Sequence, residues 1–534
     1  MQKVKNWPYL LLLLVISGLF LRLVRLPDFP PGLNWDEASL GYSAYSLLKT
    51  GHDEWGSASP LIFRAFGDYK LPSYIYLDVV PVAFLGLNPS GVRLPSVLAG
   101  TCLILMSFLL ARQIFKDDRI ALLTALLVAI EPWSLFLSRV GLEANLAAFL
   151  ICAGIVFLLR HKITPGLLFL GLSVWTYNSA RLFTPLFLLA YWVIRRPKLS
   201  TVNYLLLTVF FVPMLLQLFS PSGQARYKWV SLIDQGAINR INELRLNSDL
   251  PETLSRIFFN KVSYSLFTFT VNYLKHFSPD FLFFSGGSNY QFNIPGYGLL
   301  SLINLPFFYL GLLHLPGFHD RKNRVIFPLL AWLFLAPIPA SLTRDAPHTL
   351  RAITLLPLPM LISAFGAVKI WDRLKTHLPN YFPIVWLVCL ILSLEYYTTT
   401  VTPAYRTAYS WSWQYGYRDI VAYVRNHYSE YDRVIVSKRY GEPHIFFLFY
   451  WPWDPVAYRT DPDLIRYFKS DWYWVDSFAK FRFVNDWDLV EYVSQPHPGQ
   501  KYLTVSSPDN AAPGTPLGQI NFLDGQPAFI IKEN

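Results

Sequence analysis

The feature that most constrains this 534-residue chain is a succession of apolar stretches long enough to cross a lipid bilayer. A helix needs roughly 20 mainly apolar residues to span the hydrocarbon core. Eleven stretches approach this length: residues 7–26, 91–115, 119–138, 142–160, 163–178, 180–195, 202–219, 297–315, 325–343, 348–370 and 382–401. Only 15% of the residues are charged, well below the share in soluble proteins. The pattern predicts an α-helical polytopic membrane protein and excludes a disordered or coiled-coil chain.

The basic residues predict how the chain is threaded. The formal net charge is +11, and its excess lies before residue 403, because residues 403–534 hold 13 basic and 15 acidic residues. Six basic clusters separate the apolar stretches: Lys3/Lys5, Arg112/Lys116/Arg119, Arg160/Lys162, Arg195/Arg196/Lys198, Arg321/Lys322/Arg324 and Lys369/Arg373/Lys375. Short cytoplasmic loops are rich in Lys and Arg. We therefore expect these clusters and the N-terminus in the cytoplasm, and no nucleic-acid partner.

A twelfth apolar stretch, residues 71–88, is short and contains Asp78 and two prolines. If it crossed the membrane, the last five basic clusters would move to the opposite side. We therefore expect it to lie along the surface as an interfacial helix, which leaves about eleven transmembrane helices. The first outer loop then covers 27–90, a long outer loop covers 220–296, and the C-terminal region is extracytoplasmic.

We expect two domains. Residues 1–402 would form the transmembrane domain, and residues 403–534 a small extracytoplasmic α/β domain. In that domain, 417–428 is helix-like, 432–437 and 501–507 are strand-like, and 520–531 predicts a hairpin with Asp524-Gly525 at its turn.

Two adjacent acids in the first outer loop, Asp36 and Glu37, are the strongest candidates for chemistry. The following residues, 38–50, have an amphipathic helical pattern that ends at Gly51. A surface helix would hold both acids at the membrane boundary, where a carboxylate can act as a base toward a hydroxyl. The alternative is structural, because acids are favoured in the first turn of a helix.

Further polar residues are predicted on the same outer side. They are Lys70, Arg93, Arg139, Glu143, Asn178, Arg181, Arg344, His348 and Arg351. His348 and Arg351 are three residues apart and are predicted to share a helix face. Together with Lys70 and Arg344 they would suit a phosphate. The alternatives are basic side chains that reach lipid headgroups, and helix-capping roles for His348, Asn178 and Arg181.

Several motifs, taken in order, resemble the GT-C-fold membrane glycosyltransferases of the protein O-mannosyltransferase and lipid A aminoarabinose transferase superfamily. They are WDE (35–37), YKLP (69–72), VRLPS (92–96), RVGLEAN (139–145), YNSARLFTP (177–185) and HTLR (348–351). The run 272–300 resembles the long loop of the bacterial branch. The resemblance covers about residues 5–400.

This resemblance implies transfer of a sugar, hexose or pentose, from a polyprenyl-phosphate donor to an acceptor hydroxyl. The reaction would take place on the outer face of the cytoplasmic membrane, with inversion, and would modify cell-envelope glycans or glycolipids. The family's acid pair maps to Asp36 and Glu37, its phosphate-contacting Lys to Lys70, and its acidic turn to Arg139 and Glu143. The chain lacks the repeat-domain insertion of eukaryotic protein mannosyltransferases, which counts against a protein acceptor. The sequence by itself does not choose between lipid, glycan and protein acceptors.

A divalent metal is a further expectation, because carboxylate oxygens suit Mg²⁺ or Mn²⁺. The candidate ligands are Asp36, Glu143 and His348.

Two other functions fit part of the pattern. A transporter or lipid flippase would place ionisable residues at mid-membrane depth in two similar halves, whereas here they gather at one interface. A glycan ligase or polymerase of the same fold would use an Arg-rich long loop, and 220–296 contains Arg226, Arg240, Arg245 and Arg256.

Overall fold

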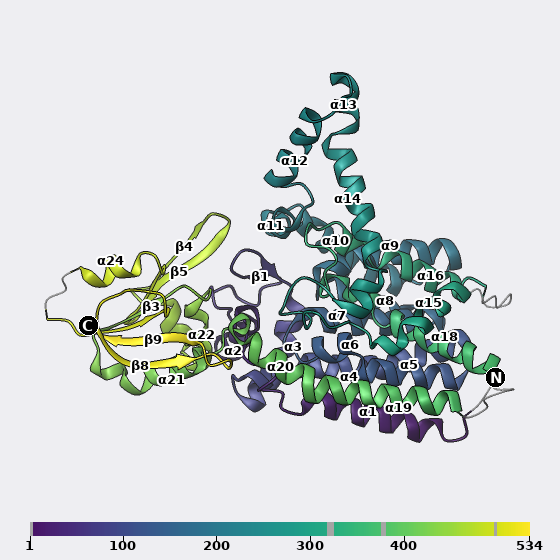
Figure 1. Ribbon diagram of the computed structural model, residues 1–534, viewed down its shortest axis with the longest axis horizontal. Coiled ribbons are helices and arrows are strands. Elements are labelled where there is room, and N and C mark those ends of the chain that lie inside the picture. Colours follow the sequence, from purple (N-terminus) through teal and green to yellow (C-terminus); the bar gives the residue numbers. More distant parts are fainter. Residues whose placement is uncertain (1–3, 318–324, 375–380, 496–498) are drawn as a thin grey trace. The chain divides into compact units, whose positions relative to one another are not determined.

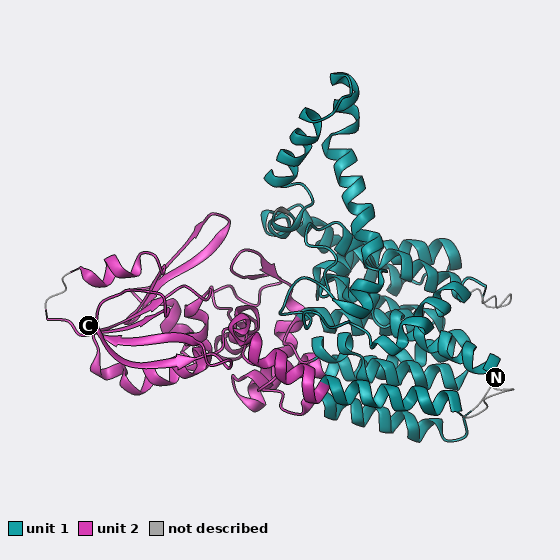
Figure 2. Cartoon of the chain, viewed as in Figure 1, with its two compact units in different colours: residues 1–22, 98–138, 143–397 teal, residues 23–97, 139–142, 398–534 magenta. Residues whose placement is uncertain are grey.

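The computed structural model describes residues 4–317, 325–374, 381–495 and 499–534 (Figure 1). Five residues of the predicted basic clusters, Lys3, Arg321, Lys322, Arg324 and Lys375, lie outside the described residues. The chain divides into two compact units (Figure 2). Unit 1 comprises residues 1–22, 98–138 and 143–397, and unit 2 comprises residues 23–97, 139–142 and 398–534.

Unit 1 is a bundle of helices. Those lying wholly or mainly in it are α1 (Trp7–Leu23), α4 (Pro89–Phe115), α5 (Asp118–Ile130), α6 (Pro132–Leu137), α7 (Glu143–Leu159), α8 (Ile163–Val174), α9 (Asn178–Arg195), α10 (Thr201–Leu218), α11 (Pro221–Val230), α12 (Gln235–Leu246), α13 (Glu252–Phe258), α14 (Lys261–Lys275), α15 (Leu305–His314), α16 (Ile326–Leu335), α17 (Ile338–Ser341), α18 (Leu358–Leu374) and α19 (Tyr381–Tyr396). Each of the eleven predicted stretches overlaps at least one of these helices.

Three helical segments of the described chain are long and apolar enough to cross a membrane by themselves. They are Pro89–Phe115, Thr201–Leu218 and Tyr381–Ala408. Several shorter apolar helices accompany them, including Trp7–Leu23 and Glu143–Leu159. These helices support a multi-pass membrane protein, while the count of eleven crossings and the orientation of the termini stay predictions.

A buried arginine joins α1 to the break between α5 and α6. Pro132 has no N–H, so the carbonyl of Val128 loses its normal helical donor. The Arg22 guanidinium donates to the carbonyls of Val128 and Ala129 at 3.0 and 3.1 Å, and to the hydroxyl of Ser134 at 3.0 Å. Arg22 is fully buried, and it stabilises the end of α5 by satisfying the Val128 carbonyl that the proline leaves open and the Ala129 carbonyl, whose helical donor, the N–H of Trp133, donates to Leu299 instead.

The predicted helix over 348–370 is wrong in its first third. The segment Arg351–Leu355 is a short 3₁₀ helix, and α18 begins only at Leu358. Pro357 explains the break, because it removes a backbone donor and disfavours the α conformation of the residue before it. His348 and Arg351 therefore do not share a face of an α-helix.

Unit 2 combines the first outer loop with the C-terminal region. Its helices are α2 (Trp35–Thr50), α3 (Pro72–Leu85), α20 (Thr402–Ala408), α21 (Tyr417–His427), α22 (Pro443–Tyr450), α23 (Pro455–Arg459) and α24 (Leu489–Ser494). Its strands are β1 (Phe63–Arg64), β2 (Tyr69–Lys70), β3 (Arg433–Ser437), β4 (Ile465–Lys469), β5 (Trp472–Phe478), β6 (Phe481–Val484), β7 (Tyr502–Ser506), β8 (Thr515–Asn521) and β9 (Pro527–Glu533).

Seven of these strands form one mixed sheet in the order β4-β5-β6-β3-β7-β9-β8. The central strand β3 pairs in parallel with β6 and β7, and the other pairs are antiparallel. Side chains of a strand alternate between the two faces. Val434 and Val436 accordingly belong to a core with α21 and α22, whereas Ile435 packs with Leu489 and Val493 of α24. The predicted helix, strands and terminal hairpin of this region are confirmed.

The first outer loop shares that core. Ala38 and Tyr42 of α2, together with Phe66 and Val92, belong to the same buried cluster as α21 and α22. Gly41 allows the close approach, because a Cβ there would lie 2.4 Å from Val92 Cγ2 and 2.8 Å from Phe449 Cε2. The loop that carries the two predicted acids is thus packed against the C-terminal region, and the division into domains at residue 402 stays a prediction.

Candidate active site

The two acids lie in the first turn of α2. Asn34 caps this helix: its side chain accepts the N–H of Glu37 at 2.9 Å, and the Glu37 carboxylate accepts the N–H of Asn34 at 3.3 Å. This reciprocal capping box satisfies two backbone donors that the helix start would leave open. Glu37 therefore has the capping role that was the structural alternative. Asp36, one position earlier, takes no part in the capping box.

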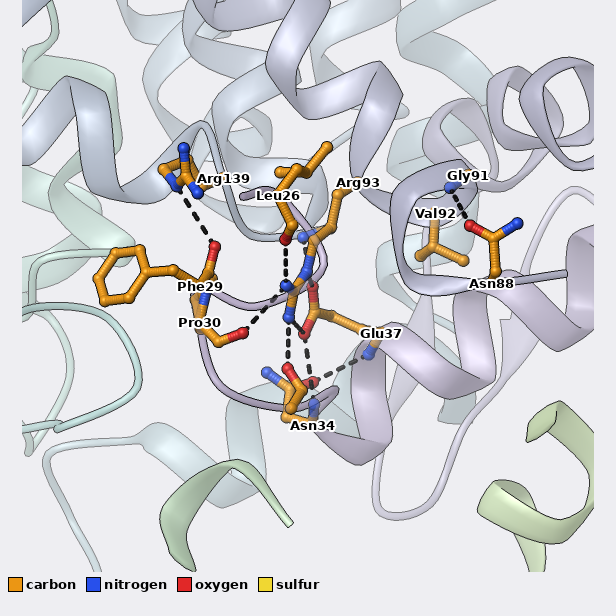
Figure 3. A network of polar contacts seen from close by, with 12 residues as sticks. Leu26, Phe29, Pro30, Asn34, Glu37, Asn88, Gly91, Val92, Arg93 and Arg139 are labelled. Atoms are coloured by element: carbon orange, nitrogen blue, oxygen red, sulfur yellow. Dashed lines mark hydrogen bonds and ion pairs between the residues drawn. The ribbon is translucent and has the colours of Figure 1, made fainter. Parts of the chain in front are cut away.

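Glu37 forms a fully buried ion pair with Arg93 (Figure 3). The Arg93 Nε and Nη2 donate to the two carboxylate oxygens at 2.9 and 3.2 Å. The remaining N–H groups of Arg93 donate to the carbonyls of Leu26 at 2.9 Å, of Pro30 at 3.1 Å, and of Gly32. A guanidinium has five N–H donors, and here all five are used. The prediction that Arg93 binds a carrier phosphate finds no support in this geometry.

The turn 139–142 also contacts the Glu37–Arg93 pair, and this pair together with the turn is called the frame of the site. The N–H of Gly141 donates to Glu37 Oε1 at 2.7 Å. A Cβ at residue 141 would lie 3.0 Å from the Val92 carbonyl oxygen, so glycine suits this close approach. Arg139 donates to the carbonyls of Val24 and Phe29 at 2.7 and 3.3 Å. Arg139 thereby ties this turn to the end of the first helix and the start of the loop.

Asp36 is the reachable acid of the pair. Its side chain is 28% exposed, whereas that of Glu37 is 0% exposed. The Lys70 ammonium lies 2.8 Å from Asp36 Oδ1 and 3.9 Å from Asp68 Oδ1. The start of α2 and the Lys70 ammonium both lie beside this carboxylate. The structure thus brings together Asp36 and Lys70, two residues predicted on the same outer side, next to the Glu37–Arg93 pair.

The predicted basic residues near 350 lie in unit 1 and are partly ion-paired. Arg344 contacts Asp234 at 2.9 Å with both side chains exposed, and Arg351 contacts Asp345 at 3.3 Å. The backbone N–H of Arg351 donates to His348 Nδ1 at 3.3 Å, which is the helix-start role considered for this histidine. The charge of Arg226, from the long loop, acts on both His348 and Arg351. Sequence spacing could not place Arg226 in this group.

The other predicted residues of unit 1 lie at helix starts. Glu143 is the first residue of α7 and is buried, and Asn178 is the first residue of α9. Arg181 is buried one turn into α9. Its Nε donates to the Val174 carbonyl at the end of α8, at 3.1 Å, and its Nη1 donates to the Gln217 side chain. Arg181 therefore caps α8, the structural alternative considered for it.

The described residues contain no group of three or more His, Cys, Asp or Glu side chains that could hold a metal ion. Asp36, one of the three candidate ligands, contacts the ammonium of Lys70.

A buried polar cluster in unit 2 was not predicted. Glu54 follows α2, and its Oε1 lies 4.0 Å from His444 Nε2 of α22, while His444 Nδ1 lies 3.5 Å from Glu442 Oε2. Burial raises the pKa of Glu54 to about 8 and that of Glu442 to about 7, and it lowers the pKa of His444 to about 3. The charge of Arg466 opposes the rise at Glu54. Burial thus favours the neutral forms of Glu54, Glu442 and His444.

This cluster makes the stability of the chain depend on pH. The pKa of Glu54 is about 8 in the folded chain and near 4.5 in the unfolded chain, so the folded chain holds the proton more tightly. This difference contributes stability that is fully present below pH 4.5 and is lost as the pH rises to about 8. His444 acts only below pH 6.5, where protonation would favour unfolding. Between pH 6.5 and 8 the free energy of unfolding should therefore fall by about 2 kcal/mol. Glu54→Gln should flatten this part of the profile of thermal midpoint against pH.

The exposed Glu491→Gln serves as the control and should leave the profile unchanged. An unchanged slope in Glu54→Gln would show that Glu54 is ionised in the folded protein.

Comparison with known proteins finds one family model that is similar to part of the chain. Residues 12–177 match the family model described as dolichyl-phosphate-mannose-protein mannosyltransferase. This region contains Asp36, Glu37, Lys70, Arg93, Arg139 and Glu143. Comparison with curated proteins finds no match.

Solved structures extend the similarity to nearly the whole chain. ArnT from Cupriavidus metallidurans bound to undecaprenyl phosphate has 14% identity and a TM-score of 0.56, over 99% of this chain and 98% of ArnT. Its apo form has 12% identity and a TM-score of 0.57, over 98% and 97%.

The apo oligosaccharyltransferase of Archaeoglobus fulgidus is also similar, with 14% identity, a TM-score of 0.51 and 84% of this chain covered. This chain spans 64% of the length of that protein. Residues 12–177 are thus similar to the dolichyl-phosphate-mannose-protein mannosyltransferase family, and the chain has the GT-C fold, which it shares with ArnT and the archaeal oligosaccharyltransferase.

Proposed function

We propose that this chain transfers a sugar from a polyprenyl-phosphate-linked donor to an acceptor hydroxyl, with inversion, at the outer face of the cytoplasmic membrane. The observation that carries the proposal is the partly exposed Asp36 paired with Lys70, next to the buried Glu37–Arg93 pair, inside the matched region. ArnT was solved with undecaprenyl phosphate, and the archaeal oligosaccharyltransferase AglB with a dolichol-phosphate and an inhibitory peptide. These ligands support a lipid-linked donor for the present chain.

In the proposed reaction, Asp36 accepts the proton of the acceptor hydroxyl while that oxygen attacks the anomeric carbon. The bond from the anomeric carbon to the phosphate oxygen breaks on the opposite side, which inverts the configuration. The carrier phosphate leaves as a stable anion and needs no strong acid. The Lys70 ammonium, already 2.8 Å from Asp36, would stabilise the charge that develops on the phosphate.

The other residues receive supporting roles. Glu37 and Arg93 would position Asp36 and not react themselves. Hydrogen bonds already engage both carboxylate oxygens of Glu37 and all five N–H donors of Arg93. Arg139 would hold the adjoining turn. Phosphate binding by His348 and Arg351 stays a prediction from the sequence. Roles for Glu143, Asn178, Arg181 and Arg344 in substrate binding, and the divalent metal, stay predictions from the sequence.

The proposal is tested by mass spectrometry of the glycolipids, glycans and proteins of the cell envelope in a deletion strain. We expect the loss of one sugar from one acceptor class, restored by the wild-type gene but not by Asp36→Asn expressed at the same level. The modified acceptor would identify lipid, glycan or protein as the second substrate. An unchanged envelope with altered uptake of a solute would contradict the proposal and favour a transporter.

A further inference from the structure

Two aromatic residues of the C-terminal region contact the short hairpin that carries Lys70. This hairpin, residues 63–70, consists of β1, β2 and the turn between them. The backbone N–H of Tyr473, in β5, donates to the carbonyl of Phe66 at 2.6 Å. The hydroxyl groups of Tyr473 and Tyr69 are 3.1 Å apart. Tyr69 directly precedes Lys70, so these contacts lie next to the proposed phosphate-binding residue.

Side-chain packing strengthens the contact. The Phe66 ring stacks on Trp472 with a centroid distance of 6.2 Å, and a Cβ at Gly67 would lie 2.5 Å from Trp472 Cε3. The Arg64 guanidinium lies 4.8 Å from the ring centroid of Tyr473. Main-chain, stacking and cation–π contacts thus all join residues 63–70 to the start of β5.

The hairpin needs such support. Its strands β1 and β2 have two residues each, and a two-stranded ribbon of this size is not stable by itself in water. A lysine side chain also has many rotamers, and fixing it against Asp36 costs conformational entropy. A backbone held in place at residues 66 and 69 reduces the freedom of the residue that follows.

We propose that Trp472 and Tyr473 are positioning residues that hold hairpin 63–70 so that the Lys70 ammonium stays at Asp36. The inference rests on the proposed function, in which Lys70 binds the carrier phosphate. The C-terminal region would then contribute to the reaction indirectly, because β5 of its sheet holds the hairpin that carries Lys70.

The register of β4 and β5 provides a matched control. Tyr467 pairs with Trp474, whereas Tyr473 pairs with Phe468. Directly paired residues lie on the same face of a ribbon and successive residues on opposite faces. Tyr467 therefore belongs to the same β4–β5 pair as Tyr473 but lies on its opposite face, and it is 39% exposed.

Hydrogen exchange of the full-length protein in detergent tests the support directly. Tyr473→Ala should speed amide exchange in residues 63–70, whereas Tyr467→Ala should not. Gly67→Ala, which forces a Cβ toward Trp472, should have the same effect as Tyr473→Ala and serves if the latter folds poorly. Unchanged exchange at 63–70 in both Tyr473→Ala and Gly67→Ala would overturn the inference.

Binding of undecaprenyl phosphate tests whether the support acts through Lys70. Tyr473→Ala should weaken this binding about tenfold, and Tyr473→Phe less. In a Lys70→Met background, Tyr473→Ala should cause no further loss, because the residue that it positions is absent. Additive losses would overturn the inference. Wild-type affinity of Lys70→Met alone would instead refute the phosphate role of Lys70, and the exchange experiment would still decide whether Tyr473 holds the hairpin.

Discussion

An Asp36→Asn protein should lose a factor of about 10²–10⁴ in sugar-transfer rate while it folds like the wild type. The asparagine keeps the size and exposure of the side chain but cannot accept the proton of the acceptor hydroxyl. The folding of α2 should not suffer, because its start is capped by Asn34 and Glu37 and not by Asp36. The measurement is transfer from a polyprenyl-phosphate-linked sugar by purified protein, together with its thermal midpoint.

The matched control is Asp28→Asn, the same substitution in the same loop. Asp28 is exposed, and its carboxylate lies 3.6 Å from the guanidinium of the exposed Arg25. This variant should keep the wild-type rate. Full activity of a folded Asp36→Asn protein would remove Asp36 from the mechanism and leave the proposed reaction without a base.

Arg93→Met should lower the free energy of unfolding by about 3–5 kcal/mol, because it leaves Glu37 as a buried and unpaired charge. It also removes the donors for the carbonyls of Leu26, Pro30 and Gly32. Arg93→Lys should recover little, since one ammonium group with three donors cannot reproduce a five-donor planar fork. Thermal or denaturant unfolding in detergent, followed by tryptophan fluorescence, measures the effect.

The exposed Arg25→Met is the control and should change stability by less than about 1 kcal/mol, as is usual for a surface pair. If Arg93→Met had wild-type stability, the Glu37–Arg93 pair would not be the frame of the site. The two variants are expected to have different effects. Asp36→Asn should lower the sugar-transfer rate without changing the free energy of unfolding, whereas Arg93→Met should mainly lower the free energy of unfolding.

Local sequence patterns predicted much of the fold. Helix α2 ends at Gly51, whose φ of 70° lies in the left-handed region that favours glycine, and the apolar pattern of 38–50 led to the same boundary. The strands β3 and β7, and the hairpin with Asp524-Gly525 at its turn, also follow the alternation and turn residues of their own segments. These features depend on neighbours a few residues away, which a sequence displays directly.

The candidate site was only partly predictable. Asp36 and Glu37 look equivalent in the sequence, and so do Lys70 and Arg93 as outer basic residues. Glu37 is set apart by partners that are 56 and 104 residues away, namely Arg93 and Gly141. The contact of Tyr69 with Tyr473 spans 404 residues. No spacing rule reaches such distances, although the run WYW (472–474) was a visible signal without an assigned partner.

The sequence by itself determined the class of the protein: apolar stretches too long for a soluble core, separated by basic clusters, with an acid pair at the start of an amphipathic helix. The hydrophobic effect and helix periodicity act locally, so composition and order suffice for these conclusions. Only the tertiary structure decided which acid is buried and which is exposed. That outcome depends on whether a distant arginine and a backbone N–H reach one carboxylate and leave the other to a lysine.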